Sequence, residues 1–164
     1  MIKLKLNKEF AFRHIAVAVA ALALSAWFAY DGFVTYPAEN EAALRKDPSL
    51  EPANLPHPER KINEQFIASG VTGLGAVVIL LLLLAEAGKS LSLENGKLKG
   101  SLTGGAEIPV DEIASVDEKL WEKKNIAYLV PKYSKRIKLD AWHFKGAKEI
   151  YLEVKQTLAA KKTA

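Results

Sequence analysis

The sequence predicts an α+β membrane protein, in which a transmembrane helix hairpin is followed by a small antiparallel β-sheet domain capped by a C-terminal helix. Residues 66–85 carry no charge, and residues 15–30 are apolar or small, with a possible extension to Tyr36. About 20 such residues in a helix span a hydrocarbon layer of about 30 Å. After Gly88 the pattern changes to alternating strands, and residues 147–160 form an amphipathic helix.

Charge divides the chain into four regions. Basic residues dominate before the first apolar segment and after the second, whereas the connection between them is acidic. Because Lys and Arg are enriched on the cytoplasmic side of a membrane, both termini are predicted to be cytoplasmic. The regions are a cytoplasmic N-terminus with the first transmembrane helix (1–36), a Pro-rich extracytoplasmic loop (37–57), a second transmembrane helix (58–87) and a cytoplasmic β domain (88–164).

The first helix is expected to begin after Asn7, a good N-cap residue, and to end near Tyr36, where Pro37 follows. Asp31 lies near its outer end and should face water, a head group or a partner subunit, because a carboxylate in hydrocarbon is costly. The alternative for residues 1–30 is a cleaved signal peptide. The aromatic residues from Trp27 to Tyr36 are typical of a membrane–water boundary and favour a span.

Five of the seven prolines lie in the connection between the two apolar segments. A short helix is possible around residues 39–46, where Glu41 and Arg45 form an i,i+4 pair. Residues 47–58 have too few apolar side chains to build a core and are predicted to be extended. This segment is either disordered or a strap that lies on another protein.

Small residues mark the predicted packing faces of the two helices. The second helix should begin near Pro58 and end at Gly88. Small residues spaced four apart allow close backbone contact in lipid. The candidate helix-packing residues are Ala16, Ala20, Ser69 and Gly73. They either pack the two helices on each other as a hairpin or contact a helix of another protein.

The region after Gly88 is predicted to form about five antiparallel strands closed by one helix. The pair Asn95-Gly96 between two alternating runs is a strong hairpin signal. The expected strands are 90–94, 97–102, 114–121, 126–130 and 136–139. Residues 108–113 are expected to form a strand end followed by a short helical turn, and residues 140–146 are expected to be irregular. In the final helix, Ala147, Ile150, Tyr151, Val154 and Leu158 form one apolar stripe.

No catalytic, metal or cofactor site is predicted. The chain has no Cys, and its three histidines are far apart in the sequence. The run Gly88-Lys89-Ser90 lacks the preceding Gly of a phosphate-binding loop, since that position is Leu83. Nucleic-acid binding is not expected either, because the net charge of +4 is weak and the basic residues are not interleaved with aromatic ones.

A basic hairpin is the candidate contact surface of the β domain. It contains Lys132, Lys135, Arg136 and Lys138. Each Lys or Arg near an anionic bilayer contributes about 1 kcal/mol to the free energy of binding to that surface. The alternative is a solvated, Lys-rich face. The acidic residues between Asp111 and Glu122 are most simply a solvated edge.

From Leu91 to about Leu158 the chain resembles bacterial pleckstrin-homology-like (PH-like) domains. The hairpin 91–98 carries this resemblance, together with the run Ile108-Pro109-Val110-Asp111-Glu112-Ile113-Ala114-Ser115-Val116-Asp117 and the final helix. Many bacterial members carry a two-helix membrane anchor before the domain. The resemblance implies a bent antiparallel sheet capped by a helix, and binding rather than catalysis, at the bacterial cytoplasmic (inner) membrane.

The sequence therefore predicts a non-catalytic accessory or scaffolding subunit of a larger membrane protein complex, without a cofactor. Its partners would be other membrane protein subunits and the lipid bilayer. The alternative is a membrane-tethered module that senses anionic lipid head groups. Under either hypothesis, Asp31 and the basic hairpin are the candidate contacts to a membrane or a partner.

Overall fold

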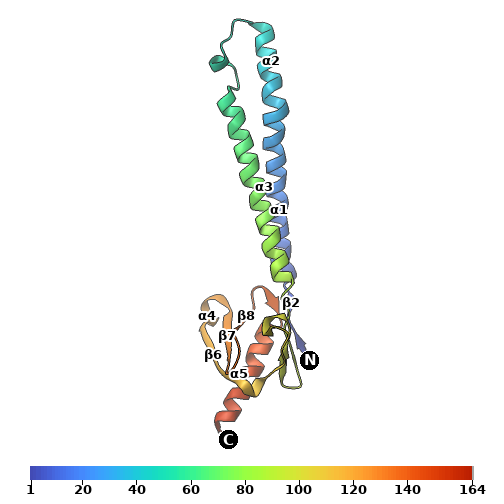
Figure 1. The fold of residues 1–164 in the computed structure, drawn as a ribbon, viewed down its shortest axis with the longest axis vertical. Helices are drawn as coiled ribbons and strands as arrows, with labels where there is room; N and C mark the ends of the chain where they lie inside the picture. Colours follow the sequence, from blue (N-terminus) through green and yellow to red (C-terminus); the bar gives the residue numbers. More distant parts are fainter. Residues whose placement is uncertain (164) are drawn as a thin grey trace. The chain divides into compact units, whose positions relative to one another are not determined.

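The computed structural model describes residues 1–163 and shows an α+β chain with two long apolar helices and small antiparallel sheets (Figure 1). Close contacts divide the chain into two units. The helical unit is Arg13–Leu82, and the sheet unit combines Met1–Phe12 with the chain from Leu83 onward. The sheet unit is thus built from segments on both sides of the helical unit in the sequence.

Two helices lie side by side in the helical unit (Figure 1). The first runs without a break over residues 8–46, through α1 (Lys8–Tyr30), a π-helical turn η1 (Asp31–Thr35) and α2 (Tyr36–Lys46). The second is α3 (Glu59–Ala87). Both are long and apolar enough to cross a bilayer, and only 11% of the apolar window of each is buried inside the structure.

The prediction that the first helix ends at Tyr36 is wrong, because the helix continues past Pro37 to Lys46. The reason lies in the π-helical turn that comes directly before the proline. The Tyr36 amide donates to the carbonyl of Asp31, five residues earlier. Pro37 has no N–H to donate, so a regular α-helix would lose one hydrogen bond at this point. The π-helical turn contains one extra residue and changes the hydrogen-bond pattern just before Pro37, so the helix continues past the proline.

The bounds predicted for the second helix agree with the structure. Glu59 follows Pro58, and the Lys61 amide donates to the Pro58 carbonyl. At the other end, the Gly88 amide donates to the carbonyl of Leu84. The connection between the helices contains one short 3₁₀ turn, η2 (Pro52–Asn54).

The described strands of the sheet unit form three antiparallel sheets, with the orders β1-β3-β4-β5, β2-β9 and β6-β7-β8. The strands are β1 (Ile2–Lys3), β2 (Lys5–Leu6), β3 (Ser92–Glu94), β4 (Lys97–Lys99), β5 (Ile108–Pro109), β6 (Ile113–Leu120), β7 (Ile126–Pro131), β8 (Ile137–Asp140) and β9 (Phe144–Lys145). Two 3₁₀ turns, η3 (Ser101–Thr103) and η4 (Val110–Glu112), and the short helix α4 (Trp121–Lys124) connect them. The helix α5 (Ala147–Thr163) follows and packs against β8, β6 and β1 (Figure 1).

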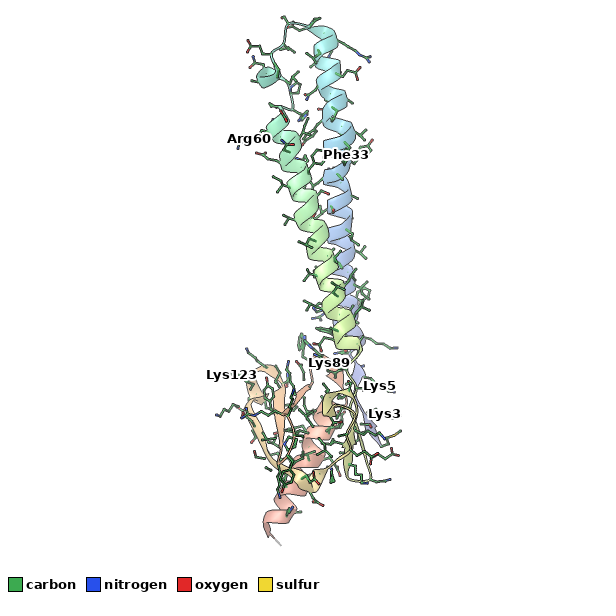
Figure 2. The ribbon with its side chains drawn as sticks, in the orientation of Figure 1. Lys3, Lys5, Phe33, Arg60, Lys89 and Lys123 are labelled. Atoms are coloured by element: carbon green, nitrogen blue, oxygen red, sulfur yellow. The ribbon has the colours of Figure 1, made fainter. Side chains whose placement is uncertain are left out.

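The N-terminal segment belongs to the sheets, which the sequence analysis missed. In β1, Ile2 pairs with Leu93, and in β2, Leu6 pairs with Phe144. Between them, the Leu4 amide donates to the Leu91 carbonyl. The pattern was present in the sequence, because apolar residues at 2, 4 and 6 alternate with lysines at 3 and 5. Lys3 of β1 and Lys5 of β2, labelled in Figure 2, therefore belong to paired strands as well as to the basic flank of the first helix.

The predicted hairpin is present between β3 and β4. Asn95 and Gly96 have φ values of +49° and +69°, as a two-residue turn of this kind requires. The flanking residues Glu94 and Lys97 pair directly. The Gly96 carbonyl also accepts a hydrogen bond from the Val110 amide, which ties the turn to η4.

One apolar core joins the three sheets and α5. The predicted stripe of the final helix is confirmed, because Ala147, Ile150, Tyr151 and Val154 are buried and Leu158 packs against them. Alternate residues of β7 and β8 meet this stripe, among them Leu129 and Leu139, which are fully buried. The expectation that residues 140–146 are irregular is wrong for Phe144–Lys145, which form β9.

Gly146 tests whether the N-terminal segment is docked as described. Its φ is +89°, and a Cβ added there would lie 2.4 Å from the carbonyl oxygen of Lys3. At the matched control Gly96, with φ +69°, a Cβ would meet nothing within 4 Å. We expect Gly96→Ala to cost about 1 kcal/mol of strain, and Gly146→Ala to cost roughly twice that or more, because backbone must also move. Denaturant unfolding of the detergent-solubilised chain, monitored by Trp fluorescence, measures the free energy of unfolding of both variants. Equal losses of stability in the two variants would contradict the close packing of the N-terminal segment on Gly146.

Candidate functional site

The contact between α1 and α3 is built around two serines. The Ser25 hydroxyl donates to the Ser69 carbonyl, and the Ser69 hydroxyl donates to the Ser25 carbonyl, both at 2.9 Å. A Cβ on Gly73 would lie 2.9 Å from Ser25 Oγ, so a larger side chain at this position would displace the Ser25 hydroxyl. Ala18 and Ala76 are fully buried. Of the four candidate packing residues, Ser69 and Gly73 therefore hold the two helices of this chain together.

Ala16 and Ala20 do not take part in this contact and remain exposed. At about 100° per residue, they lie on the side of α1 opposite Ala18 and Ser25. The hairpin interpretation is therefore wrong for these two alanines. The helix buries Ala18 and Ser25 instead, because the register between the helices is set by the two serines.

Asp31 pairs within its own helix. Its carboxylate accepts a hydrogen bond of 2.7 Å from the indole N–H of Trp27, one turn earlier. Asp31 is also the first residue of the π-helical turn. Trp27 is 67% exposed, so this polar pair lies on the outer surface of the helical unit.

A polar cluster at the far end of the helical unit was not found by sequence reasoning. The Asn40 side chain is buried, donates to the His57 carbonyl at 2.5 Å and accepts from the His57 amide at 2.9 Å. The His57 ring stacks on Tyr36 with centroids 3.7 Å apart, and its Nε2 lies 2.6 Å from Glu39 Oε2. The segment around His57 is thus fixed to α2 of the same chain.

A second histidine lies where the helix ends enter the sheet unit. His143 Nδ1 is 3.4 Å from a carboxylate oxygen of Glu86, in the last turn of α3, and 3.7 Å from one of Asp140. The His143 ring contacts Phe10 of α1, with centroids 4.1 Å apart. The Asn7 amide donates to the His143 carbonyl. The loop after β8 therefore binds the start of α1 and the end of α3.

Asp140 organises this loop. It is 5% exposed, and its carboxylate accepts from the amides of Trp142 and His143 at 3.2 Å and pairs with Lys138 at 2.9 Å. Burial alone would raise the pKa of Asp140, but the hydrogen bonds from Lys138 and the His143 amide and the positive charges outweigh it, so that its pKa is lowered.

The basic hairpin lies at the other end of β7 and β8. The two strands pair from Ile126 with Asp140 to Leu129 with Ile137. The Asp140 end carries the contact to Glu86, so the turn at residues 132–136 lies at the opposite end of the strand pair. Lys132, Lys135, Arg136 and Lys138 are all exposed. The turn of the hairpin is therefore separated from the Asp140 end, whereas Lys138 lies in β8 and pairs with Asp140.

The acidic edge is partly occupied by α5. The carboxylate of Glu118 in β6 accepts hydrogen bonds from the Tyr151 hydroxyl and, at 2.8 Å, from Lys155. A groove of about 280 Å³ lies beside this cluster, lined mainly by small and apolar residues such as Val116 and Leu158.

No group of three or more His, Asp or Glu side chains that could hold a metal ion is found within residues 1–163. Comparisons with known proteins add no assignment, since no family model, curated protein or solved structure matches the chain. The candidate binding surfaces are the exposed apolar faces of the two helices, and the basic hairpin and acidic edge of the sheet unit.

The contact between the helices predicts different effects for two glycines of α3. A Leu at position 73 would collide with Ser25, whereas a Cβ at Gly70 meets nothing within 4 Å. Gly73→Leu should separate the helices and lower the unfolding midpoint of the chain in mild detergent. Gly70→Leu should leave the midpoint nearly unchanged, as expected for an exposed helix position. A larger loss for Gly70→Leu would refute the described register.

Asp140 predicts a pH dependence. The pKa of Asp140 is lower in the folded chain than in the unfolded chain. Its contribution to the free energy of unfolding is therefore complete above the unfolded pKa of about 3.9, and it is lost as pH falls through the folded pKa. Asp140→Asn should cost about 1–3 kcal/mol at pH 7, and this difference from wild type should shrink below about pH 4. Thermal unfolding between pH 7 and pH 3 measures it. The exposed Asp111→Asn is the control; a constant Asp140→Asn penalty at all pH values would disprove the assignment.

Proposed function

We propose that this chain is a non-catalytic integral membrane protein that acts as an accessory or scaffolding subunit of a larger membrane complex. The observation that carries this proposal is the uncovered apolar surface of the two helices. In the most apolar stretch of each helix, only 11% is buried by the rest of the chain. Apolar surface on this scale requires a bilayer or a partner to cover it.

The sheet pairing supports a topology with both termini on one side. Strand β1 before the first helix pairs with β3 after the second. Two crossings bring these strands to the same side of a bilayer, and the basic flanks place that side in the cytoplasm. A signal peptide cleaved near Ala23 would remove β1, β2 and most of α1, so the paired strands also favour an uncleaved anchor.

The small-residue face of α1 is the proposed contact to a partner helix. Ala16, Ala20 and Ala23 are exposed on the side opposite α3. Small residues let a second helix approach closely, and the association of helices with one another in a bilayer depends on such packing. Trp27 and its partner Asp31 continue this face toward the outer end of the helix.

The sheet unit is the proposed cytoplasmic docking module. Its antiparallel strands and capping helix agree with the resemblance to PH-like domains, which stays a prediction. The basic hairpin is the proposed contact surface of this unit, because Lys132, Lys135, Arg136 and Lys138 are exposed.

Purification of the full chain in mild detergent tests the proposal. We expect a second membrane protein to co-purify in a fixed ratio and to remain bound through size-exclusion chromatography. Ala20→Leu should weaken this association because it fills the small-residue face, whereas Leu22→Phe, at an exposed position about 100° or more around the helix from Ala16, Ala20 and Ala23, should not. A lone monomer, or equal effects of both variants, would count against the proposal.

A further inference from the structure

A groove between α1 and α3 carries two basic side chains. It has a volume of about 260 Å³ and is lined by Arg13, His14 and Val17 of α1 and by Ile79 of α3. Of these described lining residues, two can donate hydrogen bonds to an anion, two are apolar and none is acidic. The groove therefore offers a polar end and an apolar wall within a small space.

The groove lies near the predicted cytoplasmic ends of both apolar segments. Ile79 lies six residues before Ala85, the last residue of the uncharged run of α3, and Arg13 lies two residues before Ile15, where the apolar run of α1 begins. Arg13 is exposed, and its long side chain can reach the head groups from this position. A cation at the boundary of an anionic bilayer attracts lipid head groups.

We propose that this groove binds an anionic phospholipid from the cytoplasmic leaflet. The lipid phosphate would accept hydrogen bonds from Arg13, and an acyl chain would lie along Val17 and Ile79. Charge complementarity selects this occupant, because an apolar partner helix would leave the Arg13 cation without an anion. The inference rests on the membrane insertion stated under the proposed function and names a lipid ligand in addition to the protein partner.

Arg13 is the decisive residue for the test. Each cation near an anionic head group contributes about 1 kcal/mol, which corresponds to about a fivefold change in affinity. We expect the full chain in mild detergent to bind phosphatidylglycerol more tightly than phosphatidylcholine with the same acyl chains, as measured by native mass spectrometry. Arg13→Gln should reduce this preference about fivefold. Arg45→Gln, which removes an exposed Arg from α2, should leave the preference unchanged.

A second variant separates the groove from charge alone. Val17→Phe keeps both basic side chains but fills the groove, and it should also reduce the preference for phosphatidylglycerol. The inference is overturned if the wild type binds both lipids equally, or if Arg13→Gln and Val17→Phe keep the wild-type preference.

Membrane integration is measured separately, by resistance of the full chain to alkaline extraction from membranes. A chain that is extracted contradicts the membrane anchor itself. A chain that resists extraction but shows no lipid preference contradicts only the lipid site. The two failures are therefore distinguishable.

Discussion

The constraint on which the structure depends is the apolar surface that its two helices leave uncovered. The contact between α1 and α3 buries alanines, a glycine and two serines, and most larger apolar side chains of both helices point outward. Interiors of soluble proteins place Leu, Ile, Val and Phe inside and polar residues outside, which is the reverse of this arrangement. In lipid, small residues and reciprocal serine hydrogen bonds are the usual means of holding helices together. The proposed membrane location follows from this pattern.

The sheet unit depends on both sides of the helical segment in the sequence. Residues 2–6 pair with β3 and β9, and the loop after β8 contacts Phe10 and Glu86 at the ends of the two helices. The start of the first helix and the end of the second are thereby held by one small fold.

The sequence predicted the elements whose pattern is local and strong. The uncharged run 66–85, the Asn95-Gly96 hairpin and the stripe from Ala147 to Leu158 were found because each has a clear period or turn residue. The strands at residues 2–6 are too short to be predicted from local pattern alone, and their lysines also fit a basic flank before a membrane helix. Their pairing partners lie about 90 and 140 residues away in the sequence. The continuation of the first helix past Pro37 could not be seen, because a π-helical turn has no simple sequence signature. The outward position of Ala16 and Ala20 depends on the register that Ser25 and Ser69 set, which spacing alone does not reveal.

Labelling of single cysteines in intact bacterial cells tests the membrane topology most directly, because the natural chain has no Cys. Ala53 lies in the connection between the helices and Gln156 in α5, and both are exposed. A membrane-impermeant maleimide should label Ala53→Cys in intact cells and Gln156→Cys only after the cells are opened. If Ala53→Cys is also labelled only after opening, the two helices do not place their connection outside, and the account of this chain as a protein with two crossings is contradicted.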